Sequence, residues 1–200
     1  MIVLGVTGNL STGKSEVAKL LRRRGAQVLD ADVSARKAVE RGRPAYQAIV
    51  KIFGKKFLAA GGELNRKKLG EHVFRYPKDL RKLNILIHPA VILDAFSMIH
   101  KNQNKKGTLV IDAPLLYEAK MECLADFVIV VTASQKKIFE RSRKKGIGAE
   151  LARKILAHQW PASKKAARAD FVIENNGGLK DLARKVDSVL AEIEKRTQHF

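Results

Sequence analysis

The chain has 200 residues, which suits one domain of ordinary size. Apolar residues make up 46% of it and prolines number only 5, which excludes intrinsic disorder as its main state. The net charge of +19 attracts polyanions, a class that includes nucleic acid, anionic lipid and small phosphorylated ligands.

Targeting signals are not evident in the sequence. No unbroken apolar run approaches the roughly 18 residues that a membrane helix needs. The first residues lack the basic region and the cleavage site of a signal peptide. Cys123 is the only cysteine, so an internal disulfide is excluded. These features predict a cytoplasmic protein without a membrane partner.

Predicted strands and helices alternate along most of the chain. Residues 2–7 form an apolar, β-branched run, the pattern of a central parallel strand that is covered on both faces. After a glycine-containing turn, a helix should end near Arg24 and Gly25, because cations and glycine suit a helix C-terminus. A final amphipathic helix is predicted from Leu179 to Ile193. Further strands are predicted at residues 27–30, 108–111, 127–131 and 169–173. This alternation predicts a doubly wound parallel α/β sheet.

Two segments interrupt that alternation. Residues 31–107 are too many for a simple crossover, and they contain helical apolar stripes that we expect Pro89 to interrupt. We therefore predict a helical insertion at the edge of the sheet where α/β proteins bind ligands. A second helical segment runs from Ser134 to Trp160. Residues 134–168 hold 11 basic and 2 acidic residues, a charge that suits an anionic ligand but is also common on a solvated face.

Residues 8–15 read G-N-L-S-T-G-K-S and fit the pattern G-x-x-x-x-G-K-S/T between a predicted strand and a predicted helix. Glycines let successive backbone N–H groups surround an anion, and the helix N-terminus adds positive potential. The motif assigns Lys14 to the β- and γ-phosphates and the Ser15 hydroxyl to Mg²⁺. We therefore predict an ATP-binding loop whose contacts come from Gly8, Ser11, Thr12, Gly13, Lys14, Ser15 and Glu16.

Asp30 and Asp32 close the second predicted strand, where carboxylates two residues apart point the same way. One of them could accept a proton from an attacking hydroxyl, as the catalytic aspartate of kinases does. Alternatively, Asp32 caps a helix that begins near Val33. The proximity of this strand end to the phosphate loop favours the catalytic role.

Residues 109–112 are an apolar run that ends in Asp112, the Walker-B pattern. An aspartate at this position binds Mg²⁺ directly or through water. Apolar strands that end in an aspartate are common, so an ordinary strand end is the alternative interpretation of Asp112.

Several further segments carry a more specific pattern than the phosphate loop does. They are Asp30-Ala31-Asp32, residues 62–69, 83–89, 112–118 and 169–177, and the single residues Gln159 and Lys165. Through them the chain resembles the dephospho-CoA kinase family over nearly its whole length. Enzymes of this family catalyse the last step of coenzyme A biosynthesis. The resemblance implies transfer of the γ-phosphoryl group of ATP to the 3′-hydroxyl of dephospho-CoA, with Mg²⁺.

The resemblance also implies a P-loop kinase fold in three layers with a five-stranded parallel sheet. The nucleotide-binding core then comprises residues 1–32, 107–133 and 169–200. Residues 33–106 become the helical acceptor-binding insertion, and residues 134–168 become a mobile lid.

Residue roles follow from the same resemblance. On the acceptor side, Asp32 becomes the candidate base, and Arg66 and His88 line the acceptor. On sequence grounds, a solvated face is the alternative interpretation of Arg66, and His88 could cap a helix that begins at Pro89. On the nucleotide side, Lys14 and Arg141 act on the phosphates as catalytic residues, and Asn175 lies in the segment that contacts adenine.

The sequence departs from the family pattern at two places. Residues 9–12 read Asn-Leu-Ser-Thr where the family more often has Gly-Ile-Gly-Ser, so more side chains must point outward from the loop. Lys145 replaces the usual second lid arginine and lacks the planar fork that binds two phosphate oxygens at once. We therefore expect Arg141 to be the main phosphate clamp.

Two alternatives remain at this point, a kinase of another nucleotide or small hydroxyl acceptor and a basic P-loop protein that binds nucleic acid. The second predicts aromatic side chains within a basic stripe. Aromatic residues make up only 6% of the chain, and residues 134–168 contain only Phe139 and Trp160, which argues against nucleic acid. Trp160 and Tyr117 are interpreted as packing residues.

Overall fold

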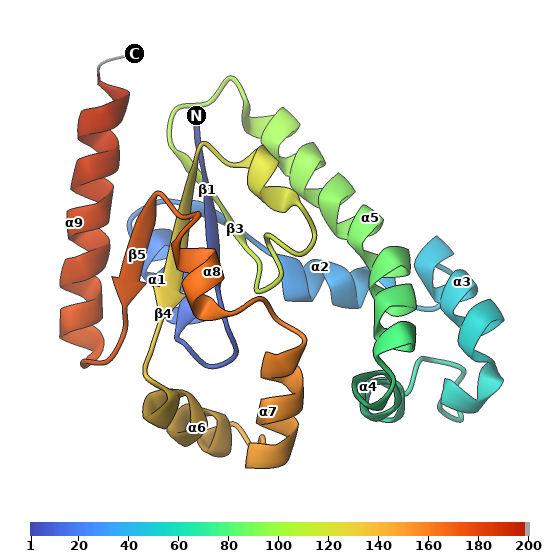
Figure 1. Ribbon diagram of the computed structural model, residues 1–200. Helices are drawn as coiled ribbons and strands as arrows, with labels where there is room; N and C mark the ends of the chain where they lie inside the picture. The colour runs from blue at the N-terminus through green and yellow to red at the C-terminus, as the bar shows by residue number, and fades with distance from the viewer. Residues whose placement is uncertain (199–200) are drawn as a thin grey trace. The chain divides into compact units, whose positions relative to one another are not determined.

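The computed structural model describes residues 1–198, and the chain divides into two units (Figure 1). The first unit comprises Met1–Leu29 and Asn102–Phe200, and the second comprises Asp30–Lys101. The first unit contains the sheet, and the second is helical apart from one short bridge between Leu58 and Leu64.

The sheet has five strands in the order β2-β3-β1-β4-β5. Its strands are β1 (Ile2–Gly8), β2 (Gln27–Asp30), β3 (Thr108–Asp112), β4 (Phe127–Thr132) and β5 (Phe171–Glu174). Strand β1 pairs in parallel with β3 and β4, and β4 pairs in parallel with β5. The predicted parallel α/β sheet is confirmed. The fifth strand begins two residues later than predicted, after Asp170, whose carboxylate accepts the backbone N–H of Val128 at 2.7 Å.

Two helices pack on the apolar core of this unit. Helix α1 (Lys14–Arg23) ends as predicted, with Gly25 at φ +92° directly after its C-cap. Helix α9 (Leu179–Thr197) buries Leu182, Val186 and Ile193 against the same cluster that contains Leu4 and Val6 of β1. Strand β1 is therefore central and buried, and its end fixes where the phosphate loop begins.

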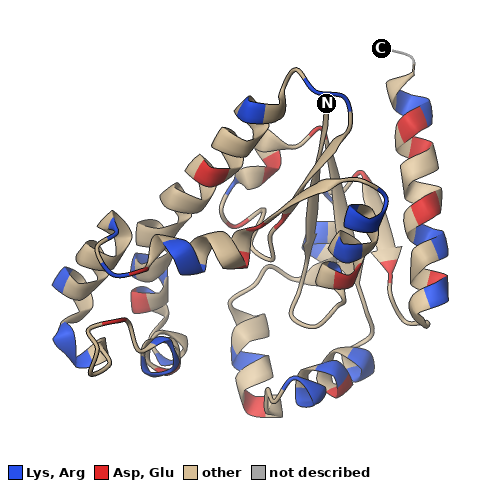
Figure 2. Ribbon diagram, turned by 180° about the vertical axis from the view of Figure 1, so that it is seen from behind, with Lys and Arg blue, Asp and Glu red and all other residues tan. Residues whose placement is uncertain are grey.

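The predicted lid begins with two helices rather than one continuous helical segment. They are α6 (Gln135–Lys144) and α7 (Ala149–Ala157), and Gly146 at φ +74° separates them. The short helix α8 (Ala162–Ala166) follows before β5, and a 3₁₀ turn, η2 (Met121–Leu124), precedes β4. Lys and Arg are frequent along α6, as the blue segments of Figure 2 show.

The second unit has a separate apolar core. Its elements are α2 (Ala31–Ala38), α3 (Pro44–Phe53), the 3₁₀ turn η1 (Lys55–Phe57), α4 (Arg66–Arg75) and α5 (Pro77–Asn102), the last residue of which belongs to the first unit. Ile49 and Phe53 of α3, Leu69 and Val73 of α4, and Phe57 form the centre of this core.

The prediction that Pro89 interrupts a helix is wrong, because α5 runs through it without a break. Proline removes one backbone donor, but residues on both sides pack: Leu83 and Leu86 against the core, and Ala95 fully buried. This packing outweighs the loss of one hydrogen bond. The alternative in which His88 caps a helix beginning at Pro89 is also wrong, since both residues lie inside α5.

Among the described residues, α5 is the one helix that is long and apolar enough to cross a membrane, judged by length and composition only. Its apolar residues are interrupted by polar ones, so the sequence contains no unbroken apolar run at this position. Leu80 and Leu83 of this helix pack on the core of the second unit, and Asp94 accepts a hydrogen bond from Ser34. The helix thus has partners within the second unit, but only 11% of its apolar window is buried.

Candidate active site

Steric contacts explain why the two motif positions of the phosphate loop, 8 and 13, are glycines. A Cβ atom on Gly8 would lie 2.5 Å from the carbonyl oxygen of Val131 in the adjacent strand. Gly13 has φ +99°, and a Cβ atom there would lie 2.0 Å from Nδ2 of Asn175. Larger residues would therefore push β4 or Asn175 away from the loop. The loop connects β1 directly to the N-terminus of α1, the arrangement that favours an anion.

Lys14 is the first residue of α1, and its ammonium forms an ion pair with Oδ1 of Asp112 at the end of β3. Both side chains are buried. The pair exists because β3 is the direct neighbour of β1, with Val6 in register with Asp112. The two residues are 98 positions apart in the chain, and nothing in their spacing indicates the pair.

Ser15 and Glu16 follow Lys14 and are exposed. Glu16 forms an ion pair with Lys19 at 2.8 Å, one turn along α1. The Ser15 hydroxyl and the Asp112 carboxylate are hard oxygen donors, the kind that Mg²⁺ takes together with water and substrate phosphates. The described residues contain no group of three or more His, Cys, Asp or Glu that would hold a metal by itself. The donor set therefore fits a magnesium ion that arrives with a nucleotide.

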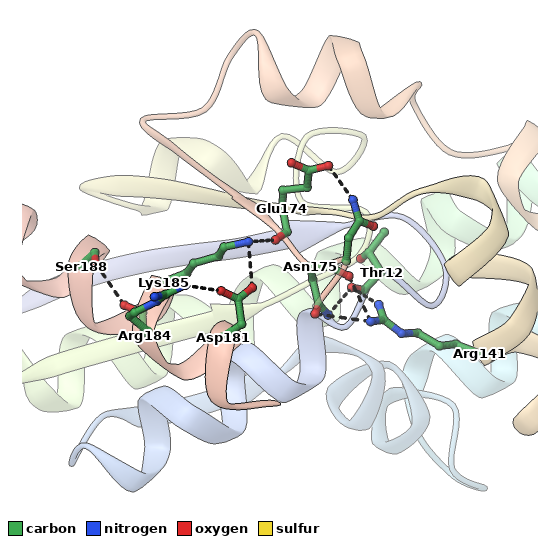
Figure 3. A network of polar contacts seen from close by, with 9 residues as sticks. Thr12, Arg141, Glu174, Asn175, Asp181, Arg184, Lys185 and Ser188 are labelled. Atoms are coloured by element: carbon green, nitrogen blue, oxygen red, sulfur yellow. Dashed lines mark hydrogen bonds and ion pairs between the residues drawn. The ribbon is translucent and has the colours of Figure 1, made fainter. Parts of the chain in front are cut away.

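Arg141 lies at the phosphate loop, as Figure 3 shows. Its guanidinium donates to the carbonyl oxygen of Thr12 at 3.1 Å and to that of Asn175 at 3.0 Å. Asn175 in turn donates from Nδ2 to the same Thr12 carbonyl at 2.8 Å. Lys145, one turn further along, is the exposed C-cap residue of α6. The structure thus brings Arg141 and Asn175 to the loop and leaves Lys145 on the surface.

The chain around Asn175 is fixed by a polar network that the sequence analysis missed (Figure 3). Lys185 of α9 donates to the carbonyl oxygen of Glu174 at 2.7 Å and pairs with Asp181 at 3.0 Å. Asn176 accepts the backbone N–H of Ser134 at 2.8 Å, just before α6. These contacts tie the end of β5 to the starts of both α9 and α6.

A buried ion pair joins α8 to the segment between β3 and η2. Lys165 of α8 lies 3.0 Å from Oε1 of Glu118, and its side chain is completely buried. Burial lowers the pKa of Lys165, and Glu118 opposes that shift. Glu118 also accepts the backbone N–H of Trp160, whose ring stacks on that of Tyr117 with 5.8 Å between centroids. Glu118 and Lys165 belonged to the family-like pattern, which was the only sequence signal for them.

Asp30 is the last residue of β2, and Asp32 lies not in the strand but in the helix that follows it. Helix α2 begins at Ala31, and Asp30 is its N-cap, accepting the backbone N–H groups of Asp32 and Val33 at 2.9 and 3.1 Å. The expectation that both carboxylates extend from one strand is therefore wrong, and so is the alternative in which Asp32 is the cap. An Asp side chain competes well for free N–H groups, so the helix starts one residue after Asp30. Asp32 is exposed in the first turn.

Arg66 and His88 both lie in the second unit. Arg66 is exposed at the start of α4, donates to the carbonyl oxygen of Arg36 at 3.0 Å, and lines a pocket of about 340 Å³ together with Arg41. His88 is half-buried within α5. The two residues are thus placed on different helices of one unit.

A parallel sheet whose central strand leads into a G-x-x-x-x-G-K-S loop, with an arginine from a separate helix at that loop, defines a P-loop kinase. The fold matches the crystal structure of TT1252 from Thermus thermophilus with a TM-score of 0.77 and 33% identity, over 96% of this chain and 97% of that one. A shikimate kinase from Bacteroides thetaiotaomicron, with 11% identity and a TM-score of 0.54 over 96% and 98% of the chains, shares the fold.

More specific comparisons point to one family. The family model for dephospho-CoA kinase matches residues 2–181. The dephospho-CoA kinase of Anaeromyxobacter dehalogenans is 46% identical over 96% of this chain and 92% of its own length. The dephospho-CoA kinase from Campylobacter jejuni has a TM-score of 0.70 and 25% identity, with 98% of both chains covered. The chain belongs to the dephospho-CoA kinase family, and the predicted family and kinase activity are confirmed.

Proposed function

We propose that this protein transfers the γ-phosphoryl group of ATP to the 3′-hydroxyl of dephospho-CoA, giving coenzyme A and ADP. The observation that carries the proposal is the meeting of Lys14 and Arg141 at one loop from different helices. Phosphoryl transfer depends mainly on positioning and on neutralising negative charge. Lys14 and Arg141, beside the N-terminus of α1, can both position the phosphates and neutralise their charge. Membership of the dephospho-CoA kinase family supports the choice of acceptor.

Lys14 must change partners for this function. Its ammonium is held by the buried carboxylate of Asp112. When the phosphates of ATP enter the loop, they offer the ammonium a stronger and more negative partner. Lys14 then contacts the β- and γ-phosphates, and Asp112 becomes available to a cation. The pair thus holds the lysine side chain near its site before the nucleotide arrives.

Mg²⁺ belongs to this proposal, and the residues that would hold it are Ser15 and Asp112. When bound, the ion would neutralise charge on the phosphate oxygens. The protein's own part is to provide one hydroxyl and one carboxylate at the start of α1 and the end of β3.

The acceptor side of the proposal uses residues of the second unit. Asp32 is the proposed base or orienting group for the 3′-hydroxyl, and Asp30, not Asp32, caps α2. The carboxylate of Asp32 is therefore not needed to start the helix. Arg66 and His88 are proposed to contact the acceptor. Arg41 and Arg66 line a pocket of about 340 Å³ and offer two guanidinium groups to an anionic acceptor, but Glu40 and Glu63 line the same pocket, so its charge alone does not select an anion.

The remaining assignments are parts of the same proposal. Asn175 lies in the segment proposed to contact adenine, residues 33–106 bind the acceptor, and residues 134–168 form the lid. A cytoplasmic location suits the two soluble substrates, ATP and dephospho-CoA.

The test is an assay with Mg-ATP and a panel of hydroxyl acceptors that includes dephospho-CoA, adenylate and several nucleosides, with products identified by mass. We expect a mass increase of one phosphoryl group on dephospho-CoA. A phosphorylated nucleoside or nucleotide together with unchanged dephospho-CoA contradicts the proposal. A salt titration of nucleic-acid binding is the control for a non-specific effect of the net charge.

A further inference from the structure

All four residues between the motif glycines contact the segment 141–160. Asn9 donates from Nδ2 to the carbonyl oxygen of Trp160, and the backbone N–H of Leu10 donates to Oε1 of Gln159, both at 2.9 Å. The Ser11 hydroxyl accepts from that of Ser142, and the Thr12 carbonyl accepts from Arg141. The side chains that replace the usual family residues are thus not simply turned outward, since those of Asn9 and Ser11 bind the predicted lid.

Ser11 is the unusual member of this set. Its φ is +57°, in the left-handed region that residues with a Cβ atom avoid. The family more often has a glycine at this position, for which the same φ carries no penalty. The Ser11 side chain is buried, and its hydroxyl lies 2.9 Å from the hydroxyl of Ser142, which is 1% exposed. A strained residue therefore has one buried polar partner on α6.

The sign of φ at Ser11 matters for phosphate binding. A backbone N–H group turns inward or outward according to the φ and ψ of the residues beside it. Loops that bind anions combine left-handed and right-handed residues so that successive N–H groups converge. Ser11 and Gly13 are the two residues of the loop with positive φ. If Ser11 relaxed to a negative φ, the peptide groups on either side would rotate and the convergence would be lost.

We propose that Ser142 is a positioning residue for nucleotide binding, which holds Ser11 at positive φ through the hydrogen bond between their hydroxyls. Ser142 touches neither phosphate nor acceptor in this role. It acts through Ser11, and its neighbour Arg141 fixes the next peptide by binding the Thr12 carbonyl. Helix α6 thereby shapes the phosphate loop. The inference rests on ATP binding at this loop, which is part of the proposed function.

The test is a double-mutant cycle of Ser142→Ala and Ser11→Gly, with the dissociation constant for ATP measured by calorimetry in the absence of any acceptor. Removing a buried hydrogen-bond donor should raise that constant roughly 3- to 10-fold in Ser142→Ala. In the Ser11→Gly background the same substitution should change it less than about 2-fold, because glycine adopts positive φ unaided. In turnover assays, the KM for ATP should rise in Ser142→Ala while kcat at saturating ATP is kept.

The matched control is Ser163→Ala, which removes an exposed serine hydroxyl from α8 in the same predicted lid and should leave ATP affinity unchanged. An unchanged ATP affinity in Ser142→Ala, or an equal loss in both backgrounds, overturns the inference. If Ser142→Ala does not fold, a double variant that folds and binds ATP like Ser11→Gly supports the inference. A double variant that also fails to fold shows a purely structural role and overturns it.

The outcomes also separate this inference from the proposed function. A wild-type protein that binds ATP but does not phosphorylate dephospho-CoA contradicts the proposed acceptor and leaves the cycle interpretable. A wild-type protein that does not bind ATP overturns both.

Discussion

The ammonium of Lys165 lies 3.0 Å from Oε1 of Glu118 and donates to the carbonyl oxygen of Pro114 at 2.6 Å, with the lysine side chain wholly buried. Pro114 and Glu118 follow β3, whereas Lys165 belongs to α8 just before β5. Since Glu118 also accepts the backbone N–H of Trp160, one carboxylate joins the end of the predicted lid to the segment that follows β3. We therefore expect the ion pair between Lys165 and Glu118 to contribute to the free energy of unfolding.

Replacing Lys165 by Met should lower the free energy of unfolding by about 3 kcal/mol, because it leaves the Glu118 carboxylate without its buried counterion. The double variant Lys165→Met, Glu118→Gln should lose less than the sum of the two single variants, since it leaves no buried charge unpaired. Urea unfolding of the four proteins measures both effects. Strictly additive losses show that the two side chains do not interact.

Lys165 should also make the stability of the protein depend on pH. Burial lowers its pKa below the ordinary value of 10.5, so between its folded pKa and pH 10.5 the unfolded chain binds more protons. The stability of the wild type relative to Lys165→Met should therefore rise with pH as 10.5 is approached. Unfolding curves of both proteins at several alkaline pH values measure the difference between their free energies of unfolding. Groups that are common to the two proteins titrate in both, so their contributions cancel in this difference. A relative stability that falls with pH contradicts the lowered pKa.

Asp79 predicts an effect of the same sign in acid, where stability again rises with pH. The hydrogen bond from His72, at 2.8 Å, and that from Lys82 lower the pKa of Asp79 below its ordinary value of 3.8. The stabilisation is thus present above pH 3.8 and is lost as pH falls through the lowered value. Asp79→Asn should have a lower Tm than wild type at neutral pH, and the two should converge in strong acid. Parallel Tm curves at all pH values exclude this role for Asp79.

Lys14→Ala should lower kcat by about 10²-fold or more, because the ammonium is placed to meet charge on the transferring phosphates. The structure adds a second effect that the motif alone does not predict. The variant removes the buried counterion of the Asp112 carboxylate, so its Tm should fall, and Asp112→Asn in the same chain should restore much of that loss. Near-normal kcat at saturating ATP would remove the loop from the mechanism. An unchanged Tm would show that the ion pair contributes nothing to stability.

How far the sequence alone predicts the site depends on how local each feature is. The glycine-containing turn between β1 and α1 and the end of that helix near Gly25 follow from residues adjacent in the chain, and both were placed correctly. The central strands follow from continuous apolar runs. These features require no knowledge of the rest of the fold.

Contacts between distant residues were not predictable in the same way. Lys14 and Asp112 are 98 residues apart and Ser11 and Ser142 are 131 apart, and only the order of the strands and the fold of α6 bring them together. The error at Pro89 has a similar origin, because packing on both sides of the proline decides whether α5 continues. The alternative in which Asp32 caps a helix was wrong by two residues, because Asp30 is the N-cap of α2. The two carboxylates are chemically equivalent, so the sequence does not indicate which of them starts the helix.

The capping geometry now separates the two aspartates experimentally. Asp32→Asn should lower kcat roughly 10²- to 10⁴-fold, with ATP affinity and Tm little changed, if its carboxylate accepts or orients the acceptor proton. Asp30→Asn is the matched variant: Asn caps a helix about as well as Asp, so kcat, ATP affinity and Tm should all stay near the wild-type values. Steady-state kinetics and melting curves on both variants distinguish the roles. The reverse pattern, with kcat lost only in Asp30→Asn, would assign the catalytic role to the cap residue.

Arg141 and Lys145 provide the corresponding comparison in the predicted lid. They are one turn apart on α6, but Arg141 binds the Thr12 carbonyl and Asn175, whereas Lys145 is exposed at the C-cap. The planar guanidinium can bind two phosphate oxygens at once, which an ammonium cannot do. Arg141→Ala should therefore reduce kcat much more than Lys145→Ala, although each variant loses one positive charge. Equal kinetic damage would show that only the total charge of the segment matters.

We expect the predicted lid, residues 134–168, to move when phosphates bind. The segment 134–168 holds 11 basic and 2 acidic residues, and like charges brought together repel unless an anion lies between them. Hydrogen exchange over this segment should therefore slow when a bisubstrate analogue supplies phosphates, and the slowing should be smaller in Arg141→Ala than in Lys145→Ala. Residues 2–8 of β1, which are buried in the sheet, serve as the internal reference. Equal exchange with and without the analogue would mean that the segment is a solvated basic face rather than a lid.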